Sequence, residues 1–192
     1  MQLKGSHLVR GLAAVALVLW VWAALPPPAP AQTRKPQTPF EIRACFLVNF
    51  ALYTEWPKEA FTDPQAPFVF GILGRDDFGK DIDIVRDNVL RGRKLVVKHY
   101  VSVKEVEGCH LLYISASEES RVTEILQHLS NSSVLTVGEM EGFLERGGML
   151  NFIVKKTTRP GYGTLGYEVN PTAAEKARLR INSQLLAKSG RD

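Results

Sequence analysis

The spacing of apolar residues predicts a helix at the start of the folded chain. Apolar residues recur there at three- and four-residue steps, which places them on one face of a helix; they are Ile42, Phe46, Leu47, Phe50 and Tyr53. Thr38 precedes Pro39 and Glu41, an order typical of an N-cap, a first-turn proline and a capping box. Because the residue before a proline avoids helical geometry, Pro57 predicts that the helix ends near Trp56.

Six short apolar runs follow, each with the length of a buried strand. They are Phe68–Leu73, Leu95–Tyr100, Leu111–Ser115, Val134–Val137, Met149–Val154 and Leu165–Val169. Helices are predicted over residues 77–89 and 117–129, after Asn170, and over residues 183–188. Strands that alternate with helices indicate a mainly parallel sheet, and the last two runs, joined without a helix, indicate an antiparallel hairpin. We therefore expect an α/β three-layer sandwich with a mainly parallel sheet of about six strands and a C-terminal antiparallel hairpin.

Residues 1–31 have the pattern of a secretory signal peptide. A basic segment precedes an uncharged run of 14 residues, Leu12–Leu25, and the segment ends in Ala29-Pro30-Ala31, which is typical of such signals. The alternative is a membrane anchor, which needs about 20 apolar residues. We expect cleavage after Ala31, a linker over residues 32–39, and one α/β domain over residues 40–188.

The charge balance gives no indication of a nucleic-acid-binding protein. The 192 residues carry 24 Lys and Arg against 20 Asp and Glu, a formal net charge of +4. Nucleic-acid interfaces are marked by clustered basic residues, and this small excess is spread along the whole chain. The hydrophobic share of 45% is that of an ordinary globular protein, so we expect a folded domain that does not bind nucleic acid.

No group of residues indicates catalysis or a metal site. The histidines at 99, 110 and 128 lack the spacing of metal ligands. Cys109 and His110 are adjacent, so on a strand they point to opposite faces and cannot act as nucleophile and base. The glycine-rich stretch at residues 161–166 matches G-x-G-x-x-G, but it leads into a strand rather than a helix, which favours a hairpin loop over a nucleotide site. We expect no enzyme activity, no cofactor and no metal.

Two features leave alternatives open. Cys45 and Cys109 are the two cysteines of the chain; an oxidising compartment favours their pairing, but a disulfide requires Cα atoms within about 7 Å. The predicted strands end in small or acidic residues at Gly74–Asp77, Ser115–Ser117 and Gly138–Glu139. Open α/β sheets bind ligands at such ends, whereas ordinary turn chemistry also explains these residues. A small-ligand crevice is the first interpretation and turns with caps are the second, which we favour.

A longer motif resembles a known family. Residues 135–143 read LTVGEMEGF and residues 146–152 read RGGMLNF, which is similar to the central signature of the YfiR family of periplasmic proteins. Other segments resemble further parts of the same pattern, namely residues 49–51, 55–57, 70–74, 108–115, 167–171 and 179–186. The resemblance covers about residues 40–188.

The resemblance implies a periplasmic three-layer α/β protein that is not an enzyme. Characterised members of the family repress an inner-membrane diguanylate cyclase by binding its periplasmic part, which lowers cyclic di-GMP and biofilm formation. The implied partner is such a cyclase or a similar membrane sensor, and a homodimer is a further expectation. The loop Lys155–Thr164 is longer than the family pattern, and Cys109 but not Cys45 matches a family cysteine, so redox control is not implied. The alternative function is a periplasmic small-ligand receptor that uses the strand-end crevice.

The surface predicted for partner binding combines one tryptophan with the last hairpin. Its residues are Trp56, Leu150, Phe152, Tyr167 and Glu168. Trp56 is either an interface anchor or a core residue under a loop, and Glu168 is either a contact or a solvated edge charge. A separate set is predicted to form turns or caps: Gly138, Gly147, Gly148 and Asn170. We expect a positive φ at one glycine of the adjacent pair, because two glycines precede a strand there.

Overall fold

The fold is described from a computed structural model that covers residues 35–86, 88–156 and 163–190. The predicted signal peptide and its cleavage site lie outside the described residues, as does the start of the glycine-rich stretch, Gly161-Tyr162. Contacts group residues 36–192 into one unit, apart from residues 1–35. Among the described helices, none has the length and apolar character needed to cross a membrane.

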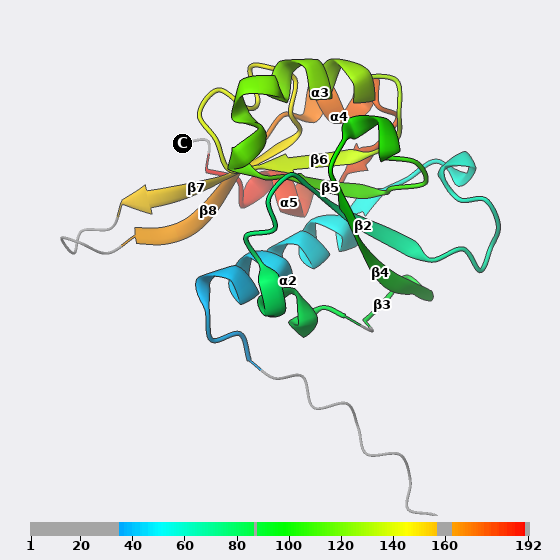
Figure 1. Ribbon diagram of the computed structural model, residues 1–192, viewed down its shortest axis with the longest axis horizontal. Coiled ribbons are helices and arrows are strands. Elements are labelled where there is room, and N and C mark those ends of the chain that lie inside the picture. The colour runs from blue at the N-terminus through cyan, green and yellow to red at the C-terminus, as the bar shows by residue number, and fades with distance from the viewer. Residues whose placement is uncertain (1–34, 87, 157–162, 191–192) are drawn as a thin grey trace, which may run out of the picture. The chain divides into compact units, whose positions relative to one another are not determined.

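Seven strands of the described chain form one curled sheet in the order β3-β4-β2-β5-β6-β7-β8 (Figure 1). The strands are β2 (Phe68–Leu73), β3 (Val89–Leu90), β4 (Arg93–Tyr100), β5 (Leu111–Ile114), β6 (Leu135–Gly138), β7 (Leu150–Lys156) and β8 (Gly163–Val169). Neighbours from β4 to β7 pair in parallel, whereas β3 with β4 and β7 with β8 pair antiparallel. The predicted mainly parallel sheet with a C-terminal antiparallel hairpin is confirmed, with β3 as an additional edge strand.

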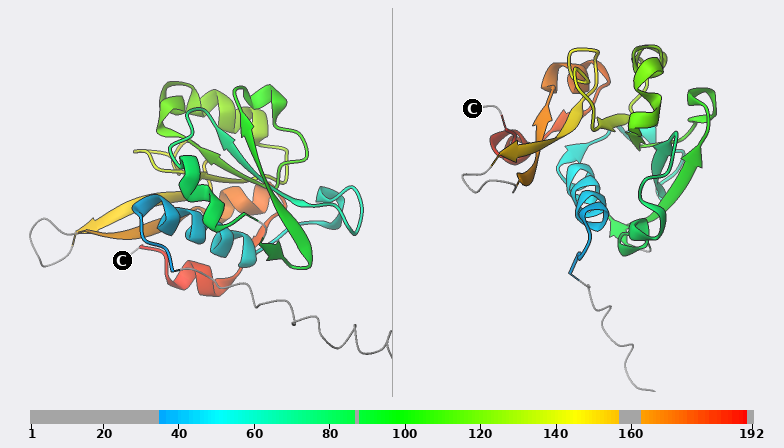
Figure 2. Two further views of the ribbon diagram at one scale, coloured as in Figure 1. Left: turned by 60° about the horizontal axis from the view of Figure 1, so that its bottom comes forward. Right: turned by 60° about the vertical axis from the view of Figure 1, so that its left-hand side comes forward.

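Helices cover both faces of this sheet. They are α2 (Pro39–Leu52), α3 (Val122–Leu129), α4 (Pro171–Lys176) and α5 (Ser183–Ala187), with short 3-10 helices at η1 (Lys58–Ala60), η2 (Gly79–Ile84), η3 (Val103–Glu105) and η4 (Ala116–Arg121). Figures 1 and 2 show α2 and α3 on opposite sides of the sheet. One apolar cluster lies under α2 and includes Phe50 and Phe152, and the other lies under α3 and includes Leu112 and Ile125. Each face of the sheet is therefore buried by its own helix layer.

The first helix begins as its sequence predicts. The Thr38 hydroxyl accepts a hydrogen bond from the Glu41 backbone N–H at 3.0 Å, and the Glu41 carboxylate accepts one from the Thr38 N–H at 3.3 Å. The helix ends at Leu52 rather than near Trp56. The reason is that the next residues form β1 (Thr54–Glu55), which pairs antiparallel with β9 (Arg180–Ile181).

The helix predicted over residues 77–89 is wrong. That segment holds the 3-10 helix η2 and then β3. Gly79, which would lie inside the predicted helix, has a φ of 51°, a left-handed conformation that an α-helix does not accept. Arg91 and Gly92 follow with φ of 51° and 81°, the pair of positive values that a type I′ hairpin turn requires. This turn joins β3 to β4.

Candidate functional site

The sheet has a topological switch point at β2. The chain passes from β2 to β4 on one side and then to β5 on the other, and ligands of open α/β sheets bind where the strand order reverses in this way. The segments that follow β2 and β5, two of the three strand ends considered for a ligand crevice, meet there. They are Gly74–Phe78 and Ser115–Ser117.

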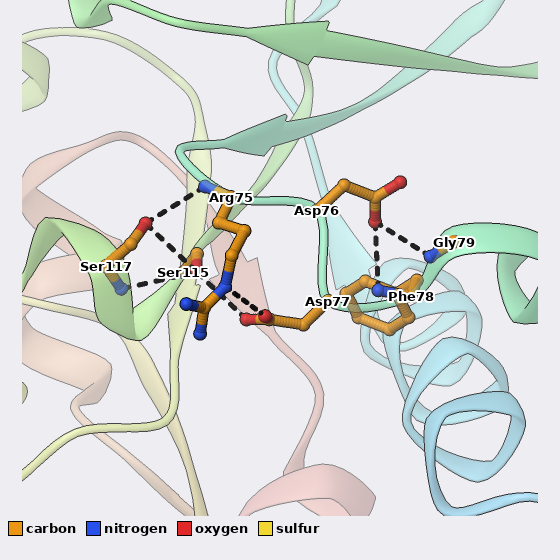
Figure 3. Close-up of polar contacts among 7 residues, drawn as sticks. All are labelled: Arg75, Asp76, Asp77, Phe78, Gly79, Ser115 and Ser117. Atoms are coloured by element: carbon orange, nitrogen blue, oxygen red, sulfur yellow. Dashed lines mark hydrogen bonds and ion pairs between the residues drawn. The ribbon is translucent and has the colours of Figure 1, made fainter.

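Four side chains from these two segments bind one another (Figure 3). The Ser115 hydroxyl donates to Asp77 Oδ2 at 3.0 Å, and the Arg75 backbone N–H donates to the Ser117 hydroxyl at 2.9 Å. Arg75 Nε also donates to Asp77 Oδ1 at 2.9 Å. The two loops are thus held together by side chains that would otherwise be available to a ligand.

The neighbouring acidic residue, Asp76, has partners too. Asp76 Oδ1 accepts from the backbone N–H groups of Phe78 at 2.9 Å and Gly79 at 3.1 Å, which closes a turn just before η2. The His99 ring lies 3.7 Å from the other oxygen of Asp76. Asp76 therefore forms part of a turn, in agreement with the turn-and-cap interpretation.

Arg43 on α2 binds the acidic residue that follows β6. Its Nε and Nη2 atoms donate to the two oxygens of Glu139 at 2.7 and 2.5 Å, and this bidentate pairing raises the pKa of Arg43. Burial, with Glu139 and Asp77 nearby, raises the pKa of Tyr113. Arg43 has no motif around it, so its role follows from tertiary packing that the sequence does not reveal.

The RGGMLNF segment and the residues before it form a loop that closes on one phenylalanine. Phe143 is fully buried, and a Cβ atom placed on Gly138 or Gly148 would lie 2.8 or 2.2 Å from its ring. Gly147 has a φ of 102°, as expected for one glycine of the pair. Asn151 holds the loop from inside, because its side chain binds both the N–H and the C=O of Met140. Gly138 and Gly148 therefore serve close packing, whereas Gly147 serves the backbone turn.

Asn170 caps α4 as predicted. Its Oδ1 accepts from the Ala173 N–H at 3.1 Å, while its Nδ2 donates to the Leu144 carbonyl at 3.0 Å. The same side chain therefore starts a helix and holds the loop before β7.

The hairpin residues predicted to contact a partner lie mostly in the core. Leu150, Phe152 and Tyr167 have exposed fractions of 0%, 2% and 5%, and the two aromatic rings pack against Phe50 of α2. Direct partner contact by these three residues is a prediction that this burial contradicts, because alternate residues of β7 and β8 face α2. Glu168, the next residue, points to the other face and is half-buried.

Trp56 lies at the opposite end of the strands, away from Glu168. The two residues do not form one surface, because Trp56 packs on the cluster under α2, whereas Glu168 faces away from it. The Trp56 ring is half-buried, meets Phe68 edge to face at 5.1 Å between centroids, and donates from Nε1 to the His110 carbonyl at 3.2 Å. Trp56 thus fits both interpretations, because part of its side chain packs in the core and part remains exposed to solvent.

His110, which accepts the hydrogen bond from Trp56, has a neutral imidazole ring. Its Nδ1 accepts from the Val69 backbone N–H at 3.0 Å, which places the proton on Nε2, and Nε2 lies 3.1 Å from the Ala60 carbonyl that accepts it. The ring is buried and stacks on Phe61, with centroids 4.3 Å apart. Burial lowers the pKa of His110. This residue fastens the loop after Trp56 to the start of the sheet.

Cys45 and Cys109 are both free thiols, so the structure does not form the disulfide that the sequence left open. Cys109 belongs to the buried cluster under α3, whereas Cys45 lies on α2, which covers the other face of the sheet. The sheet therefore stands between the two sulfur atoms. Burial raises the pKa of Cys109 to about 12, which keeps it protonated and unreactive.

Cavities also lie outside the strand-end cluster. One of about 320 Å³ lies between α3 and α4 beside Arg146, whose guanidinium donates to the carbonyls of Glu141 and Gly142. Another, of about 90 Å³, is bounded by Trp56 and Phe61. Within the residues that the structure covers, no three His, Cys, Asp or Glu side chains are grouped so as to hold a metal ion.

Comparison with known proteins gives a family match and similarity to solved structures. A family model described as YfiR/HmsC-like matches residues 40–189. A conserved domain protein from Vibrio cholerae O1 biovar El Tor has a crystal structure similar to this chain, with 14% sequence identity and a TM-score of 0.49. The similarity covers 81% of this chain and 60% of that one, so this chain spans less than two thirds of the other's length. No curated protein matches the chain.

Proposed function

Because the chain belongs to the YfiR/HmsC-like family, which is regulatory and periplasmic, we propose that it binds and represses the periplasmic part of an inner-membrane diguanylate cyclase. Its action lowers cyclic di-GMP and, through it, biofilm formation. The observation that carries this proposal is the family match over residues 40–189, which covers the whole predicted domain. The partner is recognised by protein contact and no cofactor takes part.

The accessible residues support a contact surface at the amino ends of the strands. Trp56 is half-exposed and is fixed by His110 and Phe68, and large amphipathic side chains held in this way are typical anchors of protein interfaces. Glu168 is also accessible, but it lies at the opposite end of the strands and on the other face of the hairpin, so it is not part of this surface. Leu150, Phe152 and Tyr167 contribute indirectly, because they hold the hairpin against α2.

Deletion of the gene tests the regulatory role. We expect cyclic di-GMP and surface adhesion to rise in the deletion strain and to return to the starting level when the wild-type gene is restored. A deletion that leaves cyclic di-GMP unchanged, under conditions where the protein is made, would contradict the proposal. Capture of a membrane protein with a cyclase domain by the tagged, exported protein identifies the partner.

The topology favours a second candidate, a small-ligand receptor at the switch point. The polar side chains of Arg75, Asp77, Ser115 and Ser117 converge there (Figure 3). Arg75 is largely exposed, with 74% of its side chain open to solvent. A small anion that displaces the Asp77 carboxylate can therefore bind its guanidinium. A metabolite that raises the melting temperature of the wild type, but not of an Arg75→Ala variant, would support this function.

A further inference from the structure

The cavity beside Trp56 is lined by apolar rings and two arginines. Its walls are Trp56, Phe61, Phe68, Leu90, Arg91 and Arg93, and its volume is about 90 Å³. These residues come from four places in the chain: the segment after α2, the loop before β2, the start of β2, and the β3–β4 turn. All four lie at the amino ends of the parallel strands, opposite to the polar cluster at the switch point.

The apolar wall is rigid before any partner arrives. Trp56 is held by its hydrogen bond to the His110 carbonyl, and Phe61 is stacked between His110 and the guanidinium of Arg93, which lies 3.9 Å from the ring centroid. His110 is fixed in turn by two backbone partners. A preformed cavity loses little conformational entropy on binding.

The two arginines have no acidic partner among the described residues. Arg91 Nη2 donates to the Leu52 carbonyl at 2.7 Å, and Arg93 Nη1 donates to the carbonyls of Ala66 at 2.7 Å and Asp63 at 3.1 Å. A carbonyl is uncharged, so these bonds orient the guanidinium groups without neutralising them. The adjoining hollow, which Arg91 also lines, adds Arg180 and one acid, Glu55. The rim of the cavity is therefore basic.

Arg91 stands where another residue type would be expected. It is the first residue of the two-residue turn before β4 and has a φ of 51°. Such positions favour Gly, which has no Cβ to clash with the backbone, or Asn and Asp, whose short polar side chains hydrogen-bond locally. The turn thus presents an exposed cation at the mouth of the cavity at some cost to local stability.

The size of the cavity decides between a metabolite and a protein. Pockets for small molecules have volumes of about 300–1,000 Å³, several times larger than this one. A volume of about 90 Å³ accommodates one aliphatic or aromatic side chain, which is how interface anchors are buried. We propose that the cavity takes a single apolar side chain of the repressed membrane protein, and that an Asp or Glu beside that side chain binds Arg91 and Arg93. This assignment rests on the proposed function and names the chemistry of its contact.

Charge reversal at Arg91, with a matched control, tests the assignment. Arg178 is the other non-glycine residue with positive φ in the described chain, at 61°, and it is exposed but lines none of these cavities. Arg91→Glu and Arg178→Glu therefore change charge and backbone context equally. Each variant and the wild type are expressed in the deletion strain, cyclic di-GMP is measured, and thermal unfolding of the exported protein verifies the fold.

We expect the wild type and Arg178→Glu to lower cyclic di-GMP, and Arg91→Glu to leave it at the deletion level. If Arg91→Glu unfolds early, Arg91→Gly takes its place, because glycine suits the turn and still removes the cation. A wild type that lowers cyclic di-GMP together with a fully active, folded Arg91 variant overturns the cavity assignment but leaves the regulatory role intact. Loss of activity in Arg178→Glu as well would also overturn it. A wild type without effect overturns the regulatory role itself.

Discussion

At the carboxyl ends of β2, β5 and β6, charged side chains form ion pairs, whereas at the amino ends the hydrogen bonds of Arg91 and Arg93 go to backbone carbonyls. Arg75 pairs with Asp77, and Arg43 pairs with Glu139. By contrast, Arg91 and Arg93 line an apolar cavity, and their hydrogen bonds go to main-chain oxygens. α/β proteins usually bind ligands at the carboxyl ends of the strands. In this protein the charged side chains at that end already have partners of opposite charge. This difference is why we propose partner recognition at the amino ends of the strands.

The largest effect is expected where the carboxyl-end loop is most tightly packed. In Gly148→Ala the new Cβ would overlap the ring of fully buried Phe143 at 2.2 Å, so we expect a loss of roughly 2–3 kcal/mol of unfolding free energy. Gly147→Ala has open space around its Cβ but a φ of 102°, and should cost only about 1 kcal/mol. Urea unfolding of both variants decides; equal losses would contradict the packing argument.

At the amino end, Trp56→Ala should lower the unfolding free energy by about 2 kcal/mol. Truncation of a buried aromatic residue costs about 3–5 kcal/mol, and Trp56 is only half-buried. Trp56→Phe keeps the packing on Phe68 and loses the hydrogen bond to the His110 carbonyl, so its loss should be near 1 kcal/mol. If the alanine variant were as stable as the wild type, Trp56 would not be part of a fixed wall.

Acid should weaken the amino end through His110. Its pKa is lowered in the folded protein by burial, so the unfolded chain binds the proton more readily and stability increases with pH across this range. The contribution of neutral His110 is complete above its usual pKa of 6.5, and it is lost as the pH falls through the lower folded value. The guanidinium of Arg93 faces the stack from the side of Phe61.

Two glutamine variants measure this pH effect. Unfolding free energies near pH 7.5 and pH 5 should differ less in His110→Gln than in the wild type, because the titrating group is gone. The exposed His128 provides the control, and His128→Gln should keep the wild-type difference. An unchanged pH dependence in His110→Gln would show that another group is responsible.

The smallest effect is expected for Arg75→Ala. The side chain of Arg75 is 74% exposed, and exposed ion pairs contribute about 0–1 kcal/mol. We expect a loss below about 0.5 kcal/mol in a urea titration and no change in cyclic di-GMP. A large change in cyclic di-GMP would instead favour the small-ligand function at the switch point.

The sequence predicts the sheet well because its strands are continuous apolar runs that a buried parallel sheet requires. All six predicted strands are present, and the cap of α2 forms as expected. The β3–β4 hairpin was missed because its turn is Arg91-Gly92 rather than Asn-Gly or Asp-Gly, the sequences that normally signal it. A longer helix over residues 77–89 is predicted in place of the short 3-10 helix η2, because the apolar pattern does not reveal the positive φ of Gly79.

Some residues of the candidate site could also be predicted from the sequence, and others could not. The strand-end residues are predictable, since turn and cap residues sit at fixed offsets from each strand. Arg43 and Glu139 meet across 96 positions of sequence, and no local pattern links them. The hairpin residues Leu150, Phe152 and Tyr167 follow from a family resemblance, which identifies important positions but does not distinguish core from surface. Burial makes that distinction.

Cyclase activity in detergent-solubilised membranes tests the central claim most directly. Conversion of GTP to cyclic di-GMP is measured with increasing amounts of exported wild-type protein, Arg75→Ala and Arg91→Glu. The account predicts that the wild type and Arg75→Ala reduce the rate to the same low level, whereas Arg91→Glu needs at least a tenfold higher concentration, about 1.4 kcal/mol of binding free energy. An undiminished rate at saturating wild-type protein would contradict the account.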